Sequence, residues 1–262
     1  MHAVVLAAGY ATRLRPLTDR VAKPLLPLAG RPMLDYLADK IDDVGEAEAL
    51  HVVTNSRFAP DFEAWARARS GRLSVRVHDD GTSSNTDRLG AIGDLRFVIE
   101  RAELGGDDLL VVAGDNLFDF SLEDYVRFWR ERGGSAIGVH DVGDLRLARQ
   151  YGVVELGDDD RVVSLVEKPQ QPAGTLASIA AYLFTAEHAA LVREYLDQGN
   201  APDQPGRFVV WLYPRVPVYG YRFDGDWLDI GDRAQLLEAD NRMRRRAGLA
   251  EQQEYSLQTA QS

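Results

Sequence analysis

The feature that most constrains this chain lies close to its N-terminus. A short apolar run ends at Gly9, and the loop that follows carries Arg13, Arg15, Arg20 and Lys23. A buried strand that enters a glycine-bearing basic loop suits the binding of a polyphosphate. The glycine lets backbone N–H groups approach the ligand, and the cations neutralise its charge. The alternative is an ordinary strand edge with solvated arginines, and spacing alone leaves both interpretations open.

Two well-known phosphate loops are absent from this stretch. It contains no GxxxxGK followed by Ser or Thr, which excludes a P-loop. Gly9 is followed by Tyr10 and Ala11, so the GxGxxG pattern is absent as well. A plain dinucleotide-binding domain is therefore disfavoured.

Composition narrows the function classes. The 262 residues, 45% of them hydrophobic, suffice for one large α/β domain. A net charge of −11 disfavours nucleic acid and anionic membranes as partners, so the basic loop calls for a small anionic ligand. The absence of cysteine excludes disulfides, thiolate catalysis and cysteine-bound metals. With no signal-peptide pattern, and no apolar run near the roughly 20 residues that span a bilayer, we expect a cytoplasmic protein.

The first half of the chain alternates strand-like and helix-like segments. Strands are expected at residues 2–7, 50–54, 73–77 and 109–113, and helices at residues 32–44, 60–69, 88–103 and 121–132, with Ser121 as N-cap. This alternation predicts a parallel sheet with helices on both faces. Ligands of such sheets bind beyond the carboxyl ends of the strands, where Gly9, residues 80–85 and Gly114 would meet.

The pattern changes from about residue 135. Closely spaced strands are expected at residues 135–140, 152–156, 161–166, 178–184 and 216–223, and helices at residues 186–198, 208–212 and 233–246. This half should be mixed or antiparallel. The polar end of the chain, residues 251–262, is expected to fray.

The N-terminal stretch resembles a known family. LAAGYATRLRPLT followed by AKPLLPLAGRPML is similar to the pattern of the sugar-1-phosphate nucleotidyltransferases. Ala11 departs from it where the family usually has glycine, and Ala22 departs where it usually has proline. The resemblance implies a Rossmann-like, mixed and mainly parallel sheet flanked by helices, of the nucleotide-diphospho-sugar transferase type. It also implies the transfer of a nucleotidyl group from a nucleoside triphosphate to a phosphorylated acceptor.

Two aspartates match the family's metal ligands. Asp115 follows an apolar strand in AGDN, and Asp229 lies in WLDIGD. The alternative for each is a polar turn residue. If the two carboxylates meet in the fold, their oxygens suit Mg²⁺. Asp232 takes a position where the family often has a helix N-cap, which aspartate also serves.

The acceptor site is implied by two further matches. In VEKP, the resemblance assigns Glu167 to sugar hydroxyls and Lys168 to the sugar phosphate. Tyr151 and Gly152 match a family motif that meets the sugar, and Trp227 belongs to the second aspartate motif. The alternatives are a common surface Glu-Lys pair and a core tyrosine in a hairpin.

The nucleotide site is implied less clearly. The resemblance assigns the nucleotide to Leu6, Ala7, Ala8 and Gly9, and to a base-reading region at Asp80, Gly81, Thr82 and Asn85. That region departs from the family pattern, so base and acceptor stay open. The alternative is a polar loop in which Thr86 or Asp87 caps the next helix.

The resemblance also implies roles for the remaining residues, the bounds of the domain and the ligands. Arg13 would stabilise the leaving pyrophosphate, Lys23 would contact the α-phosphate and Mg²⁺ would be the cofactor. One domain, residues 1–246, would comprise a nucleotide half (1–133), an acceptor half (134–232) and a closing helix (233–246), followed by a tail (247–262). The partners would be a nucleoside triphosphate and a small phosphorylated acceptor, and a homo-oligomer is left open. The rivals are a cytidylyltransferase for a non-sugar phosphate or phosphonate, and a non-catalytic nucleotide-sugar sensor.

Overall fold

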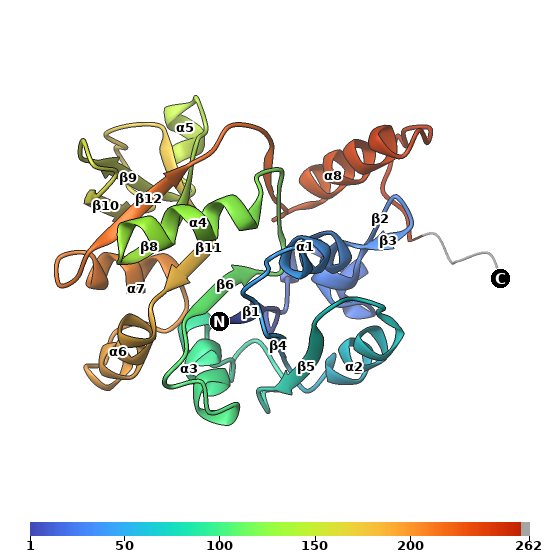
Figure 1. Cartoon of the computed structure of the whole chain (residues 1–262). Coiled ribbons are helices and arrows are strands. Elements are labelled where there is room, and N and C mark those ends of the chain that lie inside the picture. The colour runs from blue at the N-terminus through green and yellow to red at the C-terminus, as the bar shows by residue number, and fades with distance from the viewer. Residues whose placement is uncertain (258–262) are drawn as a thin grey trace.

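Four parallel strands form the N-terminal half of the sheet in the computed structural model, which describes residues 1–257 (Figure 1). β1 pairs in parallel with both β4 and β6, and β5 pairs in parallel with β4. These strands are β1 (His2–Leu6), β4 (Ala49–Thr54), β5 (Ser74–Asp79) and β6 (Leu109–Ala113). The parallel sheet that the alternating pattern predicts is confirmed.

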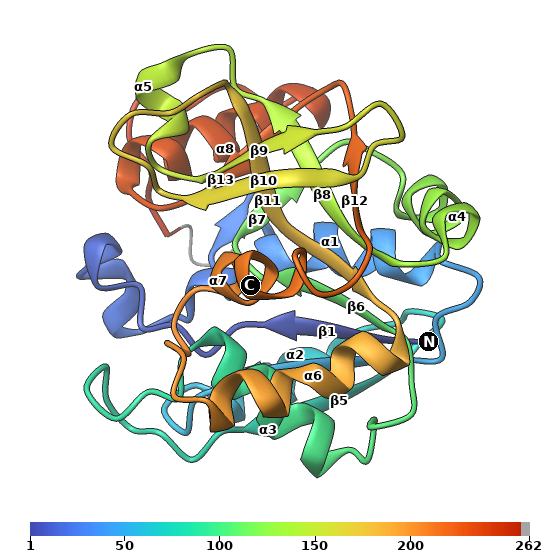
Figure 2. The ribbon, with the colours of Figure 1, turned by 90° about the vertical axis from the view of Figure 1, so that its left-hand side faces the viewer.

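Different helices cover the two faces of this sheet because side chains alternate along each strand. In β1, Ala3 and Val5 belong to one apolar core with α1, α2 and α4, whereas Val4 belongs to a second core with α3, α6 and α7 (Figure 2). The helices are α1 (Met33–Asp42), α2 (Ala59–Ala68), α3 (Ala91–Arg101), α4 (Leu122–Arg132), α6 (Ala186–Asp197) and α7 (Pro205–Leu212). No helix of the described residues is long and apolar enough to cross a membrane.

β11 joins the two halves into one nine-stranded sheet, since it pairs antiparallel with β6, β8 and β9. Its register against β8 shifts between Ser178 and Tyr182. β12 runs parallel to β8, so this half is mixed, as predicted. The strands are β8 (Ser135–Asp141), β9 (Gly152–Leu156), β10 (Val162–Glu167), β11 (Leu176–Phe184) and β12 (Val218–Arg222), and the short helix α5 (Leu145–Ala148) lies between the first two.

Two short ribbons stand outside the main sheet and are not among the strands predicted from sequence. β7 (Asn116–Phe118) pairs antiparallel with β13 (Trp227–Asp229), and β2 (Pro27–Leu28) pairs with β3 (Arg31–Pro32). Strands of two or three residues are too short to show an alternating pattern. The first ribbon carries the segment after Asp115 and ends at Asp229, so it matters for the site.

Helix starts agree with the predicted caps at two positions and not at a third. Ser121 caps α4, and Asp232 forms a capping box with Gln235 at the start of α8 (Arg233–Arg246). The helix expected from residue 88 begins instead at residue 91, with Gly90 at its N-cap and no side-chain cap. Neither Thr86 nor Asp87 caps it. Asp87 instead accepts hydrogen bonds within its own loop.

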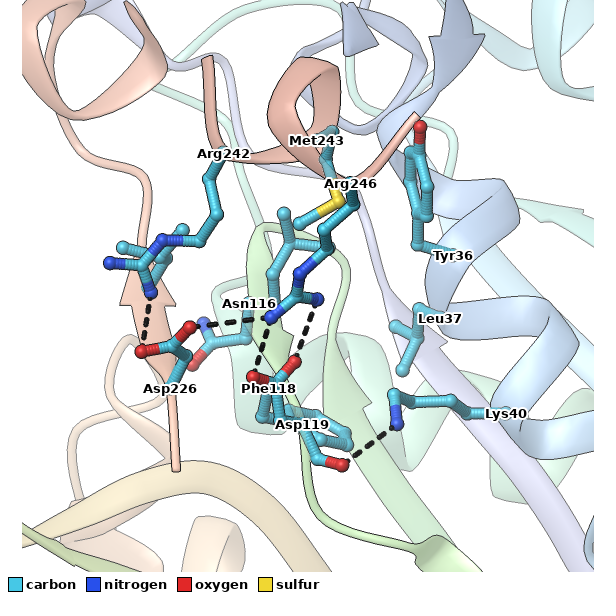
Figure 3. A pocket seen from close by; sticks show the side chains of 12 residues that line it. Tyr36, Leu37, Lys40, Asn116, Phe118, Asp119, Asp226, Arg242, Met243 and Arg246 are labelled. Atoms are coloured by element: carbon cyan, nitrogen blue, oxygen red, sulfur yellow. Dashed lines mark hydrogen bonds and ion pairs between the residues drawn. The ribbon is translucent and has the colours of Figure 1, made fainter. Parts of the chain in front are cut away.

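α8 is fixed against the β7–β13 ribbon by a polar network (Figure 3). Arg246 donates to both carboxylate oxygens of Asp119 and contacts Asp226, which also pairs with Arg242. A cavity of about 130 Å³ remains between α1, the ribbon and α8. The helix therefore holds the ribbon in place through these ion pairs.

The chain after α8 packs back onto the protein. Gln252 and Asn241 exchange two hydrogen bonds, and the Tyr255 hydroxyl donates to the Pro27 carbonyl at 2.8 Å. The expectation that residues 251–262 fray is therefore wrong for the part that the structure describes. Residues 258–262 lie outside the described residues. Polarity alone does not predict these contacts because they depend on the position of Pro27, more than two hundred residues earlier.

Candidate active site

One cleft of about 530 Å³ opens at the carboxyl ends of β1 and β6 and extends toward β9 and β10. Such an edge is where ligands bind in sheets of this type. Three of the site residues predicted from sequence, Asp80, Gly81 and Thr82, do not line it. The others do: Leu6, Ala7, Ala8, Gly9, Arg13, Lys23, Asn85, Asp115, Tyr151, Gly152, Glu167, Lys168, Trp227 and Asp229.

The N-terminal loop reaches the cleft through a strained backbone. Ala11 adopts the left-handed conformation, with φ 43° and ψ 47°, where a β-carbon is disfavoured. Its carbonyl accepts a hydrogen bond from the Thr18 hydroxyl at 2.9 Å. The short 3₁₀ turn Thr12–Leu14 follows, and buried Leu14 anchors it in a small apolar core. Arg13, on this turn, is thereby held at the cleft.

Lys23 and Asp115 form an ion pair inside the cleft. Lys23 is 9% exposed, and its ammonium lies 2.6 Å from Asp115 Oδ2. Burial alone would raise the pKa of Asp115, but the Lys23 ammonium and the Asn116 amide outweigh it and lower that pKa. The Lys23 ammonium, a group that can bind phosphate, therefore lies next to the Asp115 carboxylate, a group that can bind a metal ion.

The β7–β13 ribbon places Asp229 beside Asp115. Asp229 is the register partner of Asn116, and the Ile230 N–H donates to the Asp115 carbonyl at 3.3 Å. Trp227 Nε1 donates to Asn116 Oδ1 at 2.7 Å, and Asn116 Nδ2 donates to Asp115 Oδ1 at 3.0 Å. Burial and the Asp115 carboxylate raise the pKa of Asp229 to about 6. The two carboxylates are therefore brought together by a three-residue pairing.

This donor set is compatible with Mg²⁺. The described residues contain no group of three or more His, Cys, Asp or Glu side chains arranged around a metal position. Two carboxylates are nonetheless sufficient, because Mg²⁺ commonly takes one or two carboxylates and completes its octahedron with water and substrate phosphates. The mutual repulsion that raises the pKa of Asp229 is what a divalent cation would relieve. Asp115 and Asp229 could hold the ion together.

Glu167 occupies the part of the cleft that the resemblance assigns to the acceptor. A β-carbon on Gly152 would lie 3.1 Å from Glu167 Oε2, and one on Gly206 would collide with the same oxygen. Two glycines therefore leave the space that the carboxylate occupies. Burial raises the pKa of Glu167, partly offset by Lys168 and Arg207.

Lys168 and two aromatic rings complete this side. Lys168 has φ 47°, and its N–H donates to the Tyr151 carbonyl at 3.0 Å. The rings of Tyr151 and Trp227 lie 4.7 Å apart at an interplanar angle of 60°. Lys168 keeps an unfavourable left-handed backbone beside a carboxylate and two aromatic rings. Such strained positions are typical of functional sites and not of ordinary surface ion pairs. The lysine can receive a phosphate next to hydroxyl groups.

Three of the four residues of the predicted base-reading region, Asp80, Gly81 and Thr82, do not line the cleft. Asp80 and Thr82 are buried, and Asp80 Oδ1 accepts from both Thr82 N and Thr82 Oγ1 at 2.7 Å. Thr82 Oγ1 also contacts the Tyr10 hydroxyl at 3.2 Å. These residues support the wall, and Asn85 reaches the cleft itself.

Sequence reasoning missed a segment, residues 202–206, that connects the C-terminal half of the chain to α3. We call this segment the strap. The Ile92 N–H donates to the Pro202 carbonyl at 2.8 Å, and Arg88 pairs with Asp203 at 3.1 Å. Gly90 has φ +80°, and a β-carbon there would lie 2.8 Å from the Pro202 backbone. Only glycine fits this close contact. The strap, residues 202–206, brings Gln204 to the cleft.

Sequence reasoning also missed Asp94, which lines the cleft from the first turn of α3. A signal for it exists. Asp94 lies three residues after Ala91 and four before Val98, on the apolar face of the helix, where a carboxylate is unexpected.

Together, the basic loop, the paired carboxylates and the Glu167–Lys168 pair line one cleft at the carboxyl edge of an α/β sheet. Residues 2–246 match the family model described as Nucleotidyl transferase, and the chain belongs to this family. It is 30% identical over 246 residues to a UTP–glucose-1-phosphate uridylyltransferase of Haloferax volcanii, which covers 93% of this chain and 96% of that relative. It is 29% identical over 244 residues to a protein of the same name from a Synechocystis strain, which covers 88% of this chain. The match spans 60% of that relative's length.

A solved structure has the same fold. A UDP-glucose pyrophosphorylase complexed with UDP-glucose superposes with a TM-score of 0.78 at 20% identity, covering 94% of this chain and 98% of that one. This likeness confirms the predicted fold class, and the family match confirms the resemblance seen in the sequence.

Proposed function

We propose that this protein transfers a nucleotidyl group from a nucleoside triphosphate to a sugar 1-phosphate, giving a nucleotide sugar and pyrophosphate. The observation that carries the proposal is the shared cleft, in which Arg13, Lys23, Asp115, Asp229 and Lys168 all face one volume. Lys23 pairs with Asp115, and Arg13 and Lys168 act on the charge of Asp229, so cations for the phosphates of both substrates would lie close to the carboxylate pair. The relatives act on glucose 1-phosphate by name, which supports a sugar phosphate as acceptor.

The acceptor phosphate would itself be the nucleophile. A phosphate monoester carries most of two negative charges at neutral pH, so it needs no general base. Lys168 would bind this phosphate while Glu167, Tyr151 and Trp227 orient the acceptor hydroxyls. Positioning of this kind converts a bimolecular attack into an effectively unimolecular step.

On the nucleotide side, the chain would neutralise charge. Lys23 would move from Asp115 to the α-phosphate, and Arg13 would contact the pyrophosphate as the bond to the α-phosphorus breaks. Asp115 and Asp229 would hold Mg²⁺, which would supply positive charge to the reacting phosphates. The backbone of residues 6–9 would approach the nucleotide.

A cytidylyltransferase for a non-sugar phosphate or phosphonate is the second candidate. It is favoured by one observation: the loop in which Asp87 binds Ser83 and Ser84 replaces the family's usual base-reading pattern. A non-catalytic nucleotide-sugar sensor is less well supported, because Arg13, Lys23 and both aspartates are all present in the cleft.

The test is pyrophosphate release with Mg²⁺, using the common nucleoside triphosphates and dTTP against sugar 1-phosphates, phosphocholine and simple phosphonates. We expect one dominant pair of substrates that includes a sugar 1-phosphate. Arg13→Ala should lower kcat/KM by about 10²- to 10³-fold, as loss of a charge at the transition state commonly does. Arg20→Ala, in the same basic stretch but outside the cleft, is the matched control and should stay near the wild type.

Three outcomes decide between the candidates. Release only with CTP and a non-sugar acceptor would favour the cytidylyltransferase. Nucleotide binding without release on any acceptor would favour the sensor. Equal effects of Arg13→Ala and Arg20→Ala would contradict the role given to Arg13.

A further inference from the structure

Two buried carboxyl groups meet at the wall of the cleft without a cation. Asp94 is 6% exposed and Asp80 is 9% exposed, and one oxygen of each, Asp94 Oδ1 and Asp80 Oδ2, is buried without a hydrogen-bond partner. The Asp80 carboxylate is also close enough to act on the charge of Asp94. Among the described residues, no lysine or arginine forms an ion pair with either. Two buried carboxylates without a cation repel each other and are costly to desolvate, so one of them must carry a proton.

The proton resides on Asp94. Asp80 Oδ1 already accepts two hydrogen bonds from Thr82, so this oxygen serves as an acceptor and not as a donor. Burial, followed by the Asp80 carboxylate and its hydrogen bond, raises the pKa of Asp94 to about 8. The ionisable groups nearby are Tyr10, whose hydroxyl contacts Thr82, and Asp87 and Arg57, which act on Tyr10.

This arrangement leaves one oxygen of Asp94 for a ligand. A carboxylic acid has an O–H donor and a second oxygen that accepts. The contact with Asp80 uses the donor. Asp80 Oδ2 and Asp94 Oδ1 are the buried oxygens of the pair without another partner, which is consistent with a shared proton between them. Because Asp94 lines the cleft, its remaining oxygen is available to a bound molecule there.

The ligand group that fits this oxygen is not a phosphate. A carboxyl beside a carboxylate repels anions, and the cations that suit phosphates lie elsewhere in the cleft, at Arg13, Lys23 and Lys168. A neutral hydrogen-bond donor is the complementary group. In a bound nucleoside triphosphate the neutral donors are the ribose hydroxyls, which all ribonucleotides share, and the N–H groups of the base, which differ between nucleotides.

We propose that Asp94, held by Asp80, recognises the nucleobase by accepting an N–H hydrogen bond from its edge, and so contributes to the choice of nucleotide. The inference rests on the proposed nucleotidyltransferase function. It assigns Asp80 a supporting role behind the wall, which accounts for its position away from the cleft. It also explains why a carboxyl occupies the apolar face of α3.

Two substitutions at Asp94 test its contact with Asp80 and its acceptor oxygen separately. In Asp94→Asn, the amide N–H donates permanently to Asp80 and the carbonyl oxygen replaces the free oxygen. This variant should keep kcat/KM for the preferred nucleotide within about threefold and should melt at or above the wild-type temperature. Asp94→Leu removes the acceptor and should raise the nucleotide KM at least 30-fold, with the acceptor KM unchanged. Glu100→Gln, at the exposed end of α3, is the control and should match the wild type.

Direct binding makes the test independent of turnover. Calorimetry with the preferred nucleoside triphosphate, a non-preferred one and inorganic tripolyphosphate separates base, ribose and phosphate contacts. Equal weakening of both nucleotides in Asp94→Leu would assign the oxygen to the ribose and overturn the proposal. Asp94→Leu should weaken the nucleoside triphosphate and leave tripolyphosphate unchanged, whereas Arg13→Ala should weaken both. If no acceptor supports release, the proposed reaction fails, but this comparison still decides the role of Asp94.

The pH profile adds a second readout. Above pH 8, ionised Asp94 faces a second carboxylate at Asp80, and the repulsion pushes its side chain away from the wall. The wild-type nucleotide KM should therefore rise, while that of Asp94→Asn stays flat. This comparison also covers the case in which Asp94→Leu does not fold. The proposal is overturned if Asp94→Leu binds the nucleotide as the wild type does, if it weakens tripolyphosphate equally, or if wild type and Asp94→Asn share one pH profile.

Discussion

The Lys23 ammonium lies 2.6 Å from the Asp115 carboxylate, joining residues 92 positions apart in the sequence. This ion pair connects the nucleotide loop to the carboxylate pair. It gives each charge a partner while no substrate is bound, since an unpaired charge in this partly buried position would be costly. Substrate binding would exchange the pair for contacts with phosphate and metal.

Lys23→Ala should therefore lower kcat/KM by about 10²- to 10³-fold, because the α-phosphate loses its cation in a site of low dielectric. The measurement is steady-state pyrophosphate release with circular dichroism to verify folding. Lys40→Ala is the control, since Lys40 bonds to the Asp119 and Phe120 carbonyls outside the cleft. Near-native turnover of Lys23→Ala would contradict the role of this residue.

Gly206→Ala should impair acceptor binding specifically. A β-carbon at residue 206 collides with Glu167 Oε2, so the carboxylate must move away from the acceptor. We expect the acceptor KM to rise at least tenfold while the nucleotide KM is unchanged. Alanine is also the better helix former by about 1 kcal/mol, so the melting temperature should not fall much.

Gly45→Ala provides the comparison for Gly206→Ala, because nothing lies within 4 Å of a β-carbon at residue 45. It should leave both KM values unchanged. An unaltered acceptor KM in Gly206→Ala would show that Glu167 does not bind the acceptor, or that its side chain relaxes freely.

Ala11→Gly should stabilise the protein. The left-handed backbone at Ala11 costs an L-residue about 1–2 kcal/mol, and the added freedom of glycine in the unfolded chain offsets about 0.5–1 kcal/mol of the relief. A net gain of roughly 0.5–1 kcal/mol is expected in urea unfolding. Ala22→Gly is the control and should destabilise, because Ala22 is buried with φ −58°, where glycine brings no relief. The opposite order of stability would refute the strain at Ala11.

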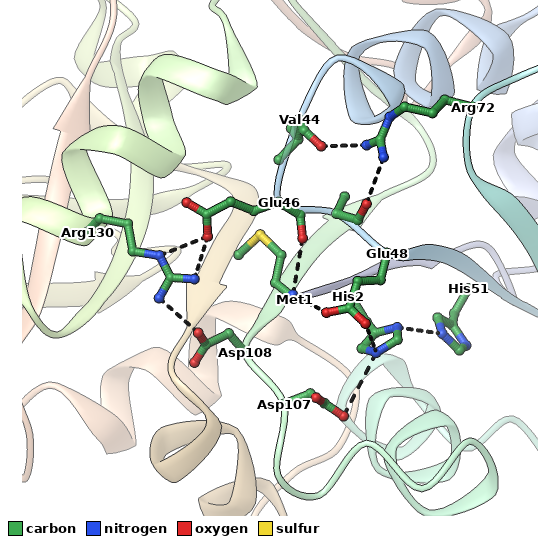
Figure 4. A network of polar contacts seen from close by, with 11 residues as sticks. Met1, His2, Val44, Glu46, Glu48, His51, Arg72, Asp107, Asp108 and Arg130 are labelled. Atoms are coloured by element: carbon green, nitrogen blue, oxygen red, sulfur yellow. Dashed lines mark hydrogen bonds and ion pairs between the residues drawn. The ribbon is translucent and has the colours of Figure 1, made fainter.

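His51→Phe should reduce the loss of stability in acid. His51 is fully buried, with its ring nitrogens 3.3 Å from His2 Nδ1 and 2.9 Å from His78 Nε2. Figure 4 shows His51 beside His2. Burial, then the neighbouring histidines, lower its pKa to about 3. In the unfolded chain the His51 imidazole binds a proton with a pKa near 6.5, whereas in the folded chain it stays neutral at that pH. His51 therefore lowers the free energy of unfolding as the pH falls below 6.5.

Between pH 7 and pH 5 the contribution of His51 amounts to about 2 kcal/mol. Asp94 acts in the opposite direction, since its raised pKa makes the folded chain bind the extra proton. The prediction is therefore a difference: His51→Phe should lose about 2 kcal/mol less than the wild type over this range, measured by urea unfolding at each pH. Equal losses would mean that His51 is protonated in the folded protein.

Much of the fold could be predicted because its strands and helices are locally patterned. The main strands and helices appear as apolar runs and helical spacings several residues long. The β7–β13 ribbon could not be predicted, because each strand has three residues and gains its identity only from its partner. The prediction that the C-terminal residues fray was wrong for a related reason. The contact between Tyr255 and Pro27 depends on tertiary packing and not on local polarity.

By itself, the sequence determined the family, the mainly parallel sheet, and the residues that carry charge to the cleft, because these depend on motifs and on short-range periodicity. Only the tertiary structure decided which side chains face the cleft. It moved Asp80 behind the wall and brought Asp94 to the surface of the site. It also set the pairing of Asp115 with Lys23 and the strap onto Gly90. Side-chain direction follows from register and packing between distant segments, and one residue of register changes the face on which a side chain lies.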